Sequence, residues 1–343
     1  MKSDSMLKEV KVQDAIGMVL AHDLTQILPG SFKGRLFKKG HVIREEDIES
    51  LLNIGKEHIY ILDLQEGYLH EDEAARRMAE AIRGEHITLS EPHEGKVSLL
   101  SDIHGLAKVN PLFVGEANAV EQVVISTLKD NTVVRPKQPI VGTRVIPLVV
   151  EEETVCRIER LAVQWRERNR EPIVSVKPFA KLKVGLITTG GEVFSGRITD
   201  KFGPVVKEKV AAFGSEVVEQ RYAPDDREKI VAEIQYFAGI GVDMILLTGG
   251  MSVDPDDRTP GAIRASGADV VSYGTPMLPG SMLMTAYLPV EDGARRIPVL
   301  GLPGCVMHDP YTSFDVLLPR ICAGETINKA DITAMGYGGL YHC

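Results

Sequence analysis

The chain has 343 residues, of which 44% are hydrophobic, and its 48 acidic against 39 basic side chains give a net charge of −9. Its length predicts two or three domains, because single cores stop growing near about 250–300 residues. The acidic balance disfavours nucleic acid and anionic membranes as partners, and no apolar run approaches the about 18 residues of a membrane helix.

The amino-terminal start has no apolar signal core, and the four cysteines are scattered without a CxxC pair. We therefore expect a cytoplasmic protein with free thiols rather than a disulfide frame or a zinc site.

The first region predicted along the chain is an α+β region over residues 1–66. Residues 15–24 have the pattern of a strand, and the Gly- and Lys-rich residues 28–40 that of loops. Residues 44–55 predict a short helix with acids in its first turn and a closing glycine, and residues 58–64 a further strand.

The second region, residues 67–178, predicts a mixed, mostly β module with helices. Residues 70–84 form a strongly amphipathic helical pattern, and residues 153–168 a second one. Short β-like runs separated by Gly and Pro lie between them. Residues 171–178 have the composition of a linker.

The third region, residues 179–327, predicts an α/β fold with a three-layer, doubly wound and mostly parallel sheet. Strand patterns alternate with helical patterns across short loops, which is typical of such a sheet. The predicted strands are 183–189, 215–223, 242–248 and 296–304, and the predicted helices are 203–214, 225–239, 259–267 and 309–324. The Gly-rich tail, residues 328–343, carries no clear pattern.

Three of these strands end in glycine-containing loops: TTGGE (188–192), TGGMS (248–252) and GLPGC (301–305). In a parallel sheet the carboxyl ends of the strands share one edge, where open α/β sheets bind ligands. Glycine lets the backbone approach a ligand, and exposed amide groups favour phosphate-like anions. The sequence therefore predicts an anion-bearing ligand at this edge.

The second loop continues into an acidic stretch with Asp254, Asp256 and Asp257. Carboxylates beside an anion repel it unless a cation lies between them, and Mg²⁺ prefers oxygen ligands. Asp257, together with Glu192 after the first glycine pair, is thus a candidate metal ligand. The alternative is a solvated loop in which Asp257 caps the helix that begins near Thr259.

Two further aspartates, Asp225 and Asp226, open the helix predicted at 225–239. Acidic residues are favoured at helix starts, so we interpret both as capping residues.

The segments TTGGEV…GRITD, TGGMSVDPDDRTP and GLPG together resemble the molybdopterin-binding domain of molybdenum-cofactor biosynthesis proteins. That family includes molybdopterin adenylyltransferases and molybdopterin molybdenumtransferases. The likeness covers about residues 180–325, and DAIGMVLAHDL upstream is similar to the amino-terminal segment of the molybdenumtransferases.

The resemblance implies a domain that holds molybdopterin by its phosphate along the sheet edge. It implies catalytic and Mg²⁺-binding roles for Asp257 and Glu192. The cofactor-binding residues it implies are Thr189, Gly190, Gly191, Thr248, Gly249, Gly250, Ser252, Pro303 and Gly304.

The chain departs from the family pattern at three places. Where the family has Thr-Gly-Asp-Glu, this chain has Gly191 in place of the aspartate. Where the family has Pro-Gly-Lys-Pro, this chain has Ser281 in place of the lysine. Gly-Leu-Pro-Gly-Asn-Pro continues here with Cys305 and Val306. Loss of a phosphate-facing lysine costs roughly 1.5–3 kcal/mol of binding.

The first hypothesis is a Mg²⁺-dependent transferase that handles adenylated molybdopterin and molybdate. The second is a carrier or storage module that binds the cofactor without chemistry, which the departures favour. The third is a nucleotide pyrophosphatase-like relative such as the competence/damage-inducible family. The resemblance also implies a homo-oligomer, either a dimer or a trimer.

Overall fold

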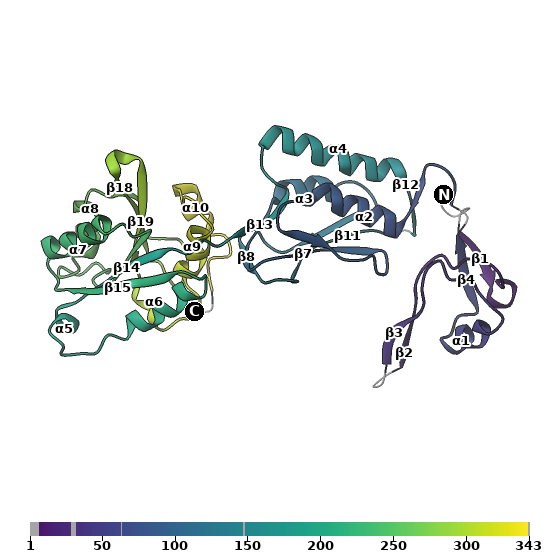
Figure 1. Ribbon diagram of the computed structural model, residues 1–343, viewed down its shortest axis with the longest axis horizontal. Coiled ribbons are helices and arrows are strands. Elements are labelled where there is room, and N and C mark those ends of the chain that lie inside the picture. Colours follow the sequence, from purple (N-terminus) through teal and green to yellow (C-terminus); the bar gives the residue numbers. More distant parts are fainter. Residues whose placement is uncertain (1–6, 29–31, 63, 147, 342–343) are drawn as a thin grey trace. The chain divides into compact units, whose positions relative to one another are not determined.

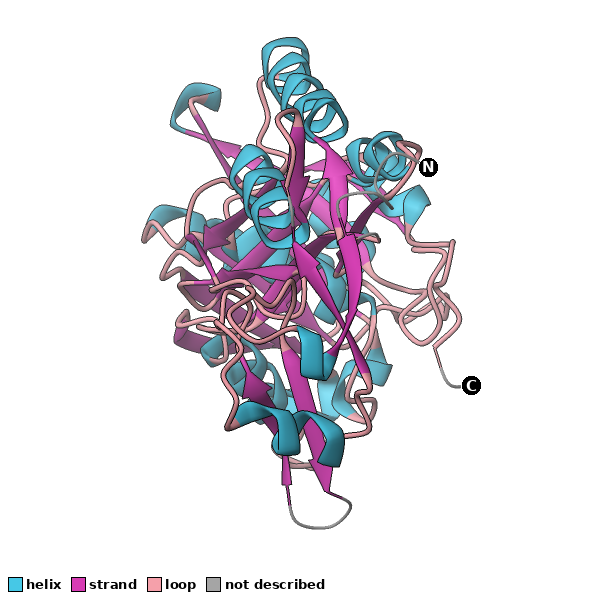
Figure 2. Cartoon of the chain, turned by 90° about the vertical axis from the view of Figure 1, so that its right-hand side faces the viewer, coloured by secondary structure: helices cyan, strands magenta, loops and turns pink. Residues whose placement is uncertain are grey.

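The computed structural model describes residues 7–28, 32–62, 64–146 and 148–341, drawn by element in Figure 1 and by secondary structure in Figure 2. The chain divides into two compact units, Met1–Lys177 and Pro178–Cys343. Among the described residues, no helix has both the length and the apolar character needed to cross a membrane.

The first unit begins with a small α+β region around its own core of Val12, Leu20, Leu51 and Ile59. Strand β1 pairs antiparallel with β4, and β2 pairs antiparallel with β3. In chain order the elements are β1 (Leu7–Lys11), η2 (Val12–Asp14), β2 (Leu24–Leu28), β3 (Phe32–Phe37), α1 (Asp47–Asn53) and β4 (His58–Leu62).

Two predictions for this region are wrong. Residues 15–24 form no continuous strand: a turn and isolated bridges at Val19 and Leu20 precede β2, which begins only at Leu24. Residues 28–40 are not all loop, because β3 lies within them. Strand β3 carries Lys, Gly and Arg in succession at its centre and has no strand pattern of its own, and its pairing with β2 stabilises it.

The rest of the first unit packs helices against small antiparallel sheets. Strands run in the order β6-β7-β11-β9 in a four-stranded sheet, β10-β8-β13 in a three-stranded sheet, and β12-β5 in a pair. In chain order the elements are β5 (Tyr68–His70), α2 (Glu71–Ile82), β6 (Ile87–Leu89), β7 (Lys96–Ser101), β8 (Gly105–Val109), α3 (Pro111–Asn118), β9 (Val123–Thr127), β10 (Thr132–Val134), β11 (Pro139–Val145), β12 (Val149–Glu151), α4 (Glu152–Asn169) and β13 (Val174–Pro178).

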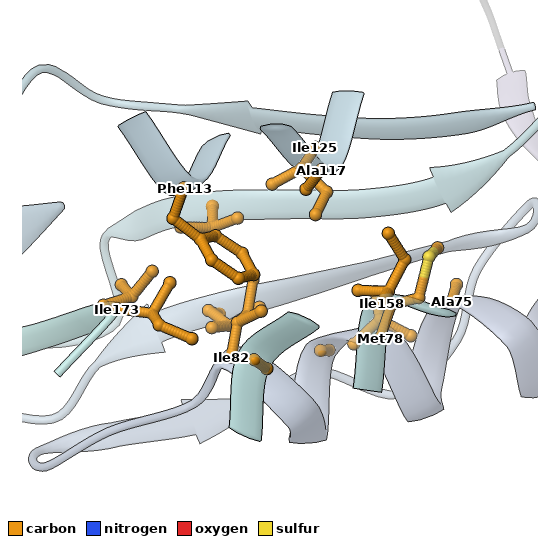
Figure 3. Packing of buried hydrophobic residues seen from close by; sticks show 14 of the residues in the cluster. Ala75, Met78, Ile82, Phe113, Ala117, Ile125, Ile158 and Ile173 are labelled. Atoms are coloured by element: carbon orange, nitrogen blue, oxygen red, sulfur yellow. The ribbon is translucent and has the colours of Figure 1, made fainter. Parts of the chain in front are cut away.

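Helix α2 forms because its apolar residues recur every three or four positions, so that they share one face. Ala75, Met78 and Ile82 on this face are fully buried against Phe113 of α3 and Ile158 of α4, as Figure 3 shows. The helices predicted at 70–84 and 153–168 are thus confirmed as α2 and α4. Residues 171–178 are not a linker, because β13 lies there and joins the sheet beside β8.

The second unit is built on one six-stranded sheet in the order β15-β14-β16-β19-β18-β17. The first four strands are parallel, and β18 and β17 are antiparallel to their neighbours. The elements are β14 (Lys183–Thr189), α5 (Gly191–Phe194), α6 (Phe202–Ala211), β15 (Glu216–Ala223), α7 (Arg227–Gly239), β16 (Met244–Thr248), α8 (Thr259–Ala265), β17 (Asp269–Tyr273), β18 (Met284–Val290), η3 (Glu291–Gly293), β19 (Arg295–Leu302), η4 (Gly304–Met307), α9 (Ser313–Cys322) and α10 (Lys329–Ala334).

Helices cover both faces of this sheet, because successive strand residues point to opposite sides. In β16, Leu246 packs in a core with α6, α9 and α10, whereas Leu247 packs in another core with α7 and α8. The predicted three-layer, mostly parallel α/β fold is confirmed. The sequence reading missed β17 and β18, which add an antiparallel edge.

The tail that carries no clear sequence pattern also has structure. Ile332 of α10 is buried in the core of the second unit, and Leu340 forms a parallel bridge with Leu278. Part of the tail therefore belongs to this unit.

Candidate functional site

The carboxyl ends of β14, β16 and β19 lie side by side at one edge of the sheet, here called the rim. Thr188 of β14 is the register partner of Thr248 in β16, and Thr248 is the partner of Leu302 in β19. The loops that begin at Gly190, Gly249 and Pro303 therefore leave three adjacent strands at the same level. This is the arrangement that the loop motifs predict.

Buried threonines connect the first two loops and the start of α8. The hydroxyl of Thr189 donates to the carbonyl of Thr248 over 3.2 Å and lies 3.1 Å from the hydroxyl of Thr259. Thr259 in turn donates to the carbonyl of Gly249 over 2.9 Å. Thr189 and Thr248 are 3% and 0% exposed, and their hydroxyl groups bond to neighbouring strands and fix the loops.

Gly249 and Gly250 occupy conformations that exclude side chains. Their φ angles are +87° and +55°, in the left-handed region that favours glycine. A Cβ at Gly249 would overlap the carbonyl oxygen of Thr189, and one at Gly250 would lie 2.9 Å from the hydroxyl of Thr259. The second loop can approach the threonine cluster this closely only because both residues are glycine.

Backbone donors differ between the first and second loops. Gly190 donates its N–H to the carbonyl of Ala223 over 3.2 Å, and Gly191 donates to the carboxylate of Asp225 over 2.8 Å. Within the described part of the chain, the N–H groups of residues 249–252 donate to no acceptor. A run of free amides in a turn is a binding surface for anions, so the second loop is the better candidate cradle.

Tyr273, at the end of β17, holds the second loop from the antiparallel side of the sheet. Its hydroxyl donates to the carbonyls of Met251 and Ser252 over 2.9 and 3.2 Å. Burial, and then the negative charge of Asp257, raise the pKa of Tyr273, which favours the protonated donor form. Sequence reasoning missed this residue, because β17 itself was not predicted.

The acidic stretch of the second loop forms a tight turn. Asp257 donates its N–H to the carbonyl of Asp254 over 3.0 Å, and its Oδ2 accepts from the Asp254 N–H over 3.2 Å. Asp257 is half-buried, whereas Asp254 and Asp256 are exposed. Helix α8 has Arg258 as its N-cap residue without a side-chain cap, so Asp257 does not cap it as the alternative interpretation required.

Two carboxylates lie at the first loop. Glu192 is exposed in α5, and its Oε2 lies 3.5 Å from the place of a Cβ on Gly190. The Asp225 carboxylate lies equally close, 3.5 Å, to the place of a Cβ on Gly191. Asp226 caps α7 as predicted, accepting from two amides over 3.0 Å each. The capping role predicted for Asp225 is wrong, because its carboxylate binds Gly191 at the rim.

The third loop packs beside the second. Gly301, in β19, leaves room for Met251, since a Cβ there would lie 2.5 Å from the Met251 sulfur. Pro303 is buried, and exposed Gly304 begins η4. Burial, and then Asp309, raise the pKa of the neighbouring Cys305, so this cysteine is a neutral thiol at pH 7.

The described residues contain no cluster of three or more His, Cys, Asp or Glu that could hold a metal ion alone. Glu192 and Asp257 nevertheless offer hard oxygen donors. Apart from the one Asp257 oxygen bonded to Asp254, their carboxylate oxygens have no hydrogen-bond partner within the described part. Mg²⁺ commonly binds through one or two carboxylates together with phosphate oxygens. Glu192 and Asp257 are thus each of the donor type that Mg²⁺ takes beside a phosphate ligand.

Residues 185–322, which include all three loops, match the family described as "Probable molybdopterin binding domain". The second unit carries a domain of this family. The predicted resemblance is therefore confirmed. In the first unit, residues 9–63 match a "Domain of unknown function (DUF8806)".

Among curated proteins, the chain is 31% identical over 153 residues to a molybdopterin molybdenumtransferase of Synechococcus elongatus, covering 42% of this chain and 37% of that protein. It is also 31% identical over 90 residues to a CinA-like protein of Mycobacterium sp., covering 26% of this chain and 21% of that protein. The chain thus spans well under half the length of these relatives. The molybdopterin-binding domain is related to both.

Among solved structures, the molybdopterin biosynthesis enzyme MoaB from Thermus thermophilus is 22% identical, with a TM-score of 0.33. The likeness covers 42% of this chain and 98% of that one.

Proposed function

We propose that the molybdopterin-binding domain holds molybdopterin by its phosphate at the rim and acts as a Mg²⁺-dependent transferase on adenylated molybdopterin and molybdate. The observation that carries this proposal is the set of three in-register strand ends, β14, β16 and β19, with free amides in the loop after β16. The relationship to a molybdenumtransferase supports the same choice of substrate.

In this proposal each loop has a separate task. The amides of residues 249–252 receive the phosphate oxygens, and the hydroxyl of Ser252, which is exposed, adds a donor. Gly190 and Gly304 let the ligand approach the outer two strands without side chains in the way. Tyr273 keeps the second loop in place through its two carbonyl contacts.

Asp257 and Glu192 would hold Mg²⁺ together with oxygens of the ligand. The chemistry that this ion supplies when bound is neutralisation of negative charge on pyrophosphate or molybdate oxygens.

The test is an assay of the purified full chain with adenylated molybdopterin, molybdate and Mg²⁺. We expect loss of the adenylate and appearance of molybdenum-loaded cofactor, both abolished by a chelator. Release of AMP without molybdenum loading, or no change in the substrate, would contradict the transferase.

A carrier function is the second candidate, and one observation favours it. Gly191 has no side chain that could bind a ligand, and its amide already donates to Asp225. The first loop therefore has fewer hydrogen-bond donors for a ligand than the second loop has. A carrier would bind the cofactor and leave the adenylate intact in the same assay. A nucleotide pyrophosphatase-like activity, suggested by the CinA-like relatives, would instead cleave ordinary nucleotides.

We further propose that the protein works in the cytoplasm as a homo-oligomer, either a dimer or a trimer. Light scattering of the purified chain measures the oligomeric state directly.

A further inference from the structure

The amino-terminal region of the first unit contains a surface groove remote in sequence from the rim. It is a cavity of about 420 Å³ next to η2 and α1, which lie in contact; Figure 1 labels α1 in this region. Its lining residues are Gln13, Ile16, Glu45, Ile48, Glu49 and Leu52. None of them has a role in the function proposed for the second unit.

Half of the lining residues are apolar: Ile16, Ile48 and Leu52. Ile16 is 50% exposed and Leu52 is 40% exposed, although both are large aliphatic side chains. Leu51, next to Leu52 on α1, is fully buried in the small core, so the helix already has its apolar partner on the other face. Single exposed aliphatic residues are ordinary, but a group of them around a concavity is typical of an interaction surface.

The charged side chains around the groove are acidic. Glu45 and Glu49 line it, and the exposed Asp14 and Glu46 follow the lining residues Gln13 and Glu45 in sequence. No lysine or arginine is among the lining residues of this described cavity. The nearby Arg44 lies 3.3 Å from Glu46, so these two charges partly offset each other and Glu45 and Glu49 carry the acidic character of the groove.

This charge distribution selects among possible occupants. Two copies of the chain that meet groove to groove would oppose like charges, and an anionic lipid surface would also be repelled. A segment with apolar side chains flanked by Lys or Arg matches both the apolar lining and the acidic edge. We propose that this groove docks a basic amphipathic helix of a partner protein.

The probe is a fluorescently labelled, helix-forming peptide of leucine and lysine, titrated with the purified full chain while anisotropy is recorded. A glutamate-for-lysine version and a serine-for-leucine version of the peptide are the ligand controls. We expect the leucine–lysine peptide alone to bind, with an affinity that falls as salt is raised.

Three variants locate the binding. Glu45→Lys/Glu49→Lys reverses the groove charge, and we expect affinity to fall about tenfold or more. Leu52→Ser removes apolar contact, and we expect a loss of about fivefold or more. Glu116→Lys/Glu121→Lys makes the same charge change at exposed positions elsewhere in the first unit, and we expect less than about twofold change. Circular dichroism establishes that each variant is folded.

The proposal is overturned if the Glu116/Glu121 pair weakens binding as much as the groove pair, because attraction would then be non-specific. It is also overturned if the serine–lysine peptide binds equally well. Binding to anionic vesicles, or a dimer that Leu52→Ser dissociates, would assign the groove to a lipid surface or a second copy instead.

Discussion

At the scale of single residues, the rim is defined by what glycine permits and by where carboxylates lie. Gly249 and Gly250 let the second loop pack directly against Thr189 and Thr259. Any residue with a side chain at these two positions would displace the threonines. Asp257 adds a half-buried carboxylate to the same loop. Its hydrogen bond to Asp254 orients it and leaves its second oxygen without a partner within the described part.

We predict that Asp257→Ala lowers any transferase rate by about a hundredfold or more, since charge-stabilising groups in active sites have effects of this size. The substitution loses one hydrogen bond at a half-buried position, so the free energy of unfolding should change by only about 1 kcal/mol. Steady-state kinetics and thermal unfolding measure the two effects.

Asp256→Ala is the matched control, because Asp256 is exposed in the same loop. We expect near-normal activity from it. Full activity in Asp257→Ala would remove this carboxylate from the mechanism.

The candidate site illustrates what sequence can and cannot predict at this scale. The glycine loops were predictable, because each follows a buried strand whose end is marked by Gly or Pro. Asp225 was misinterpreted as a cap, since an aspartate before a helix has the same local pattern whether it binds that helix or a neighbouring loop. Only the parallel pairing of β14 with β15 brings the loop after β15 to Gly191.

At the scale of elements, the sheet of the second unit depends on close contact between β14 and α7. A Cβ on Gly185 of β14 would overlap the ring of Phe237, which is fully buried in α7. We predict that Gly185→Ala lowers the free energy of unfolding by about 1–3 kcal/mol through overpacking.

Gly239→Ala, in the same helix, is the control, because a Cβ there would meet nothing within 4 Å. Chemical unfolding should show it to be neutral or slightly stabilising. Equal stability of Gly185→Ala and the unsubstituted protein would mean that Phe237 has room to move.

Helix α2 of the first unit begins with a buried acid, Glu71, only 6% exposed. Burial, and then the charge of Asp72, raise the pKa of Glu71 from 4.5 to about 7. Because the folded state holds this proton more tightly than the unfolded state, the free energy of unfolding falls as pH rises from 4.5 to about 7. The fall should amount to roughly 3 kcal/mol.

Glu71→Gln should remove this fall and leave the unit more stable than the unsubstituted protein at pH 8. Urea unfolding followed by fluorescence measures it, since the chain's single tryptophan, Trp165, packs in the same core as α2. Parallel pH profiles for the two proteins would contradict the assignment to Glu71.

Comparison of the predicted with the observed strands and helices shows which sequence patterns predict secondary structure. The parallel strands β14 and β16 and the long helices α2 and α4 were predictable because apolar runs and helical periodicity are local signals. Strands β3 and β13 were not, since β3 has Lys, Gly and Arg in succession and β13 resembles a linker. Their strand character comes from pairing with β2 and β8, which are contacts that no local pattern records.

At the scale of the whole molecule, the chain combines two units with separate cores. Both cores of the second unit consist only of residues after Pro178, and those of the first unit only of residues before it. A unit with its own core can in principle fold alone.

We therefore predict that a fragment of residues 178–343 is folded and unfolds cooperatively. Circular dichroism during thermal unfolding tests this, with the full chain measured in parallel. A fragment without a cooperative transition would mean that the second unit needs the first.

The central claim is that the rim of the molybdopterin-binding domain holds a pterin phosphate. Its most direct test is mass spectrometry of small molecules released from the full chain, purified from a host that makes the cofactor, beside a folded Gly250→Ala variant. A Cβ at position 250 would crowd Thr259 and disturb the loop with the free amides. We expect molybdopterin or its oxidised form from the unsubstituted protein and little from the variant. Absence of any pterin, or equal amounts from both proteins, would contradict the claim.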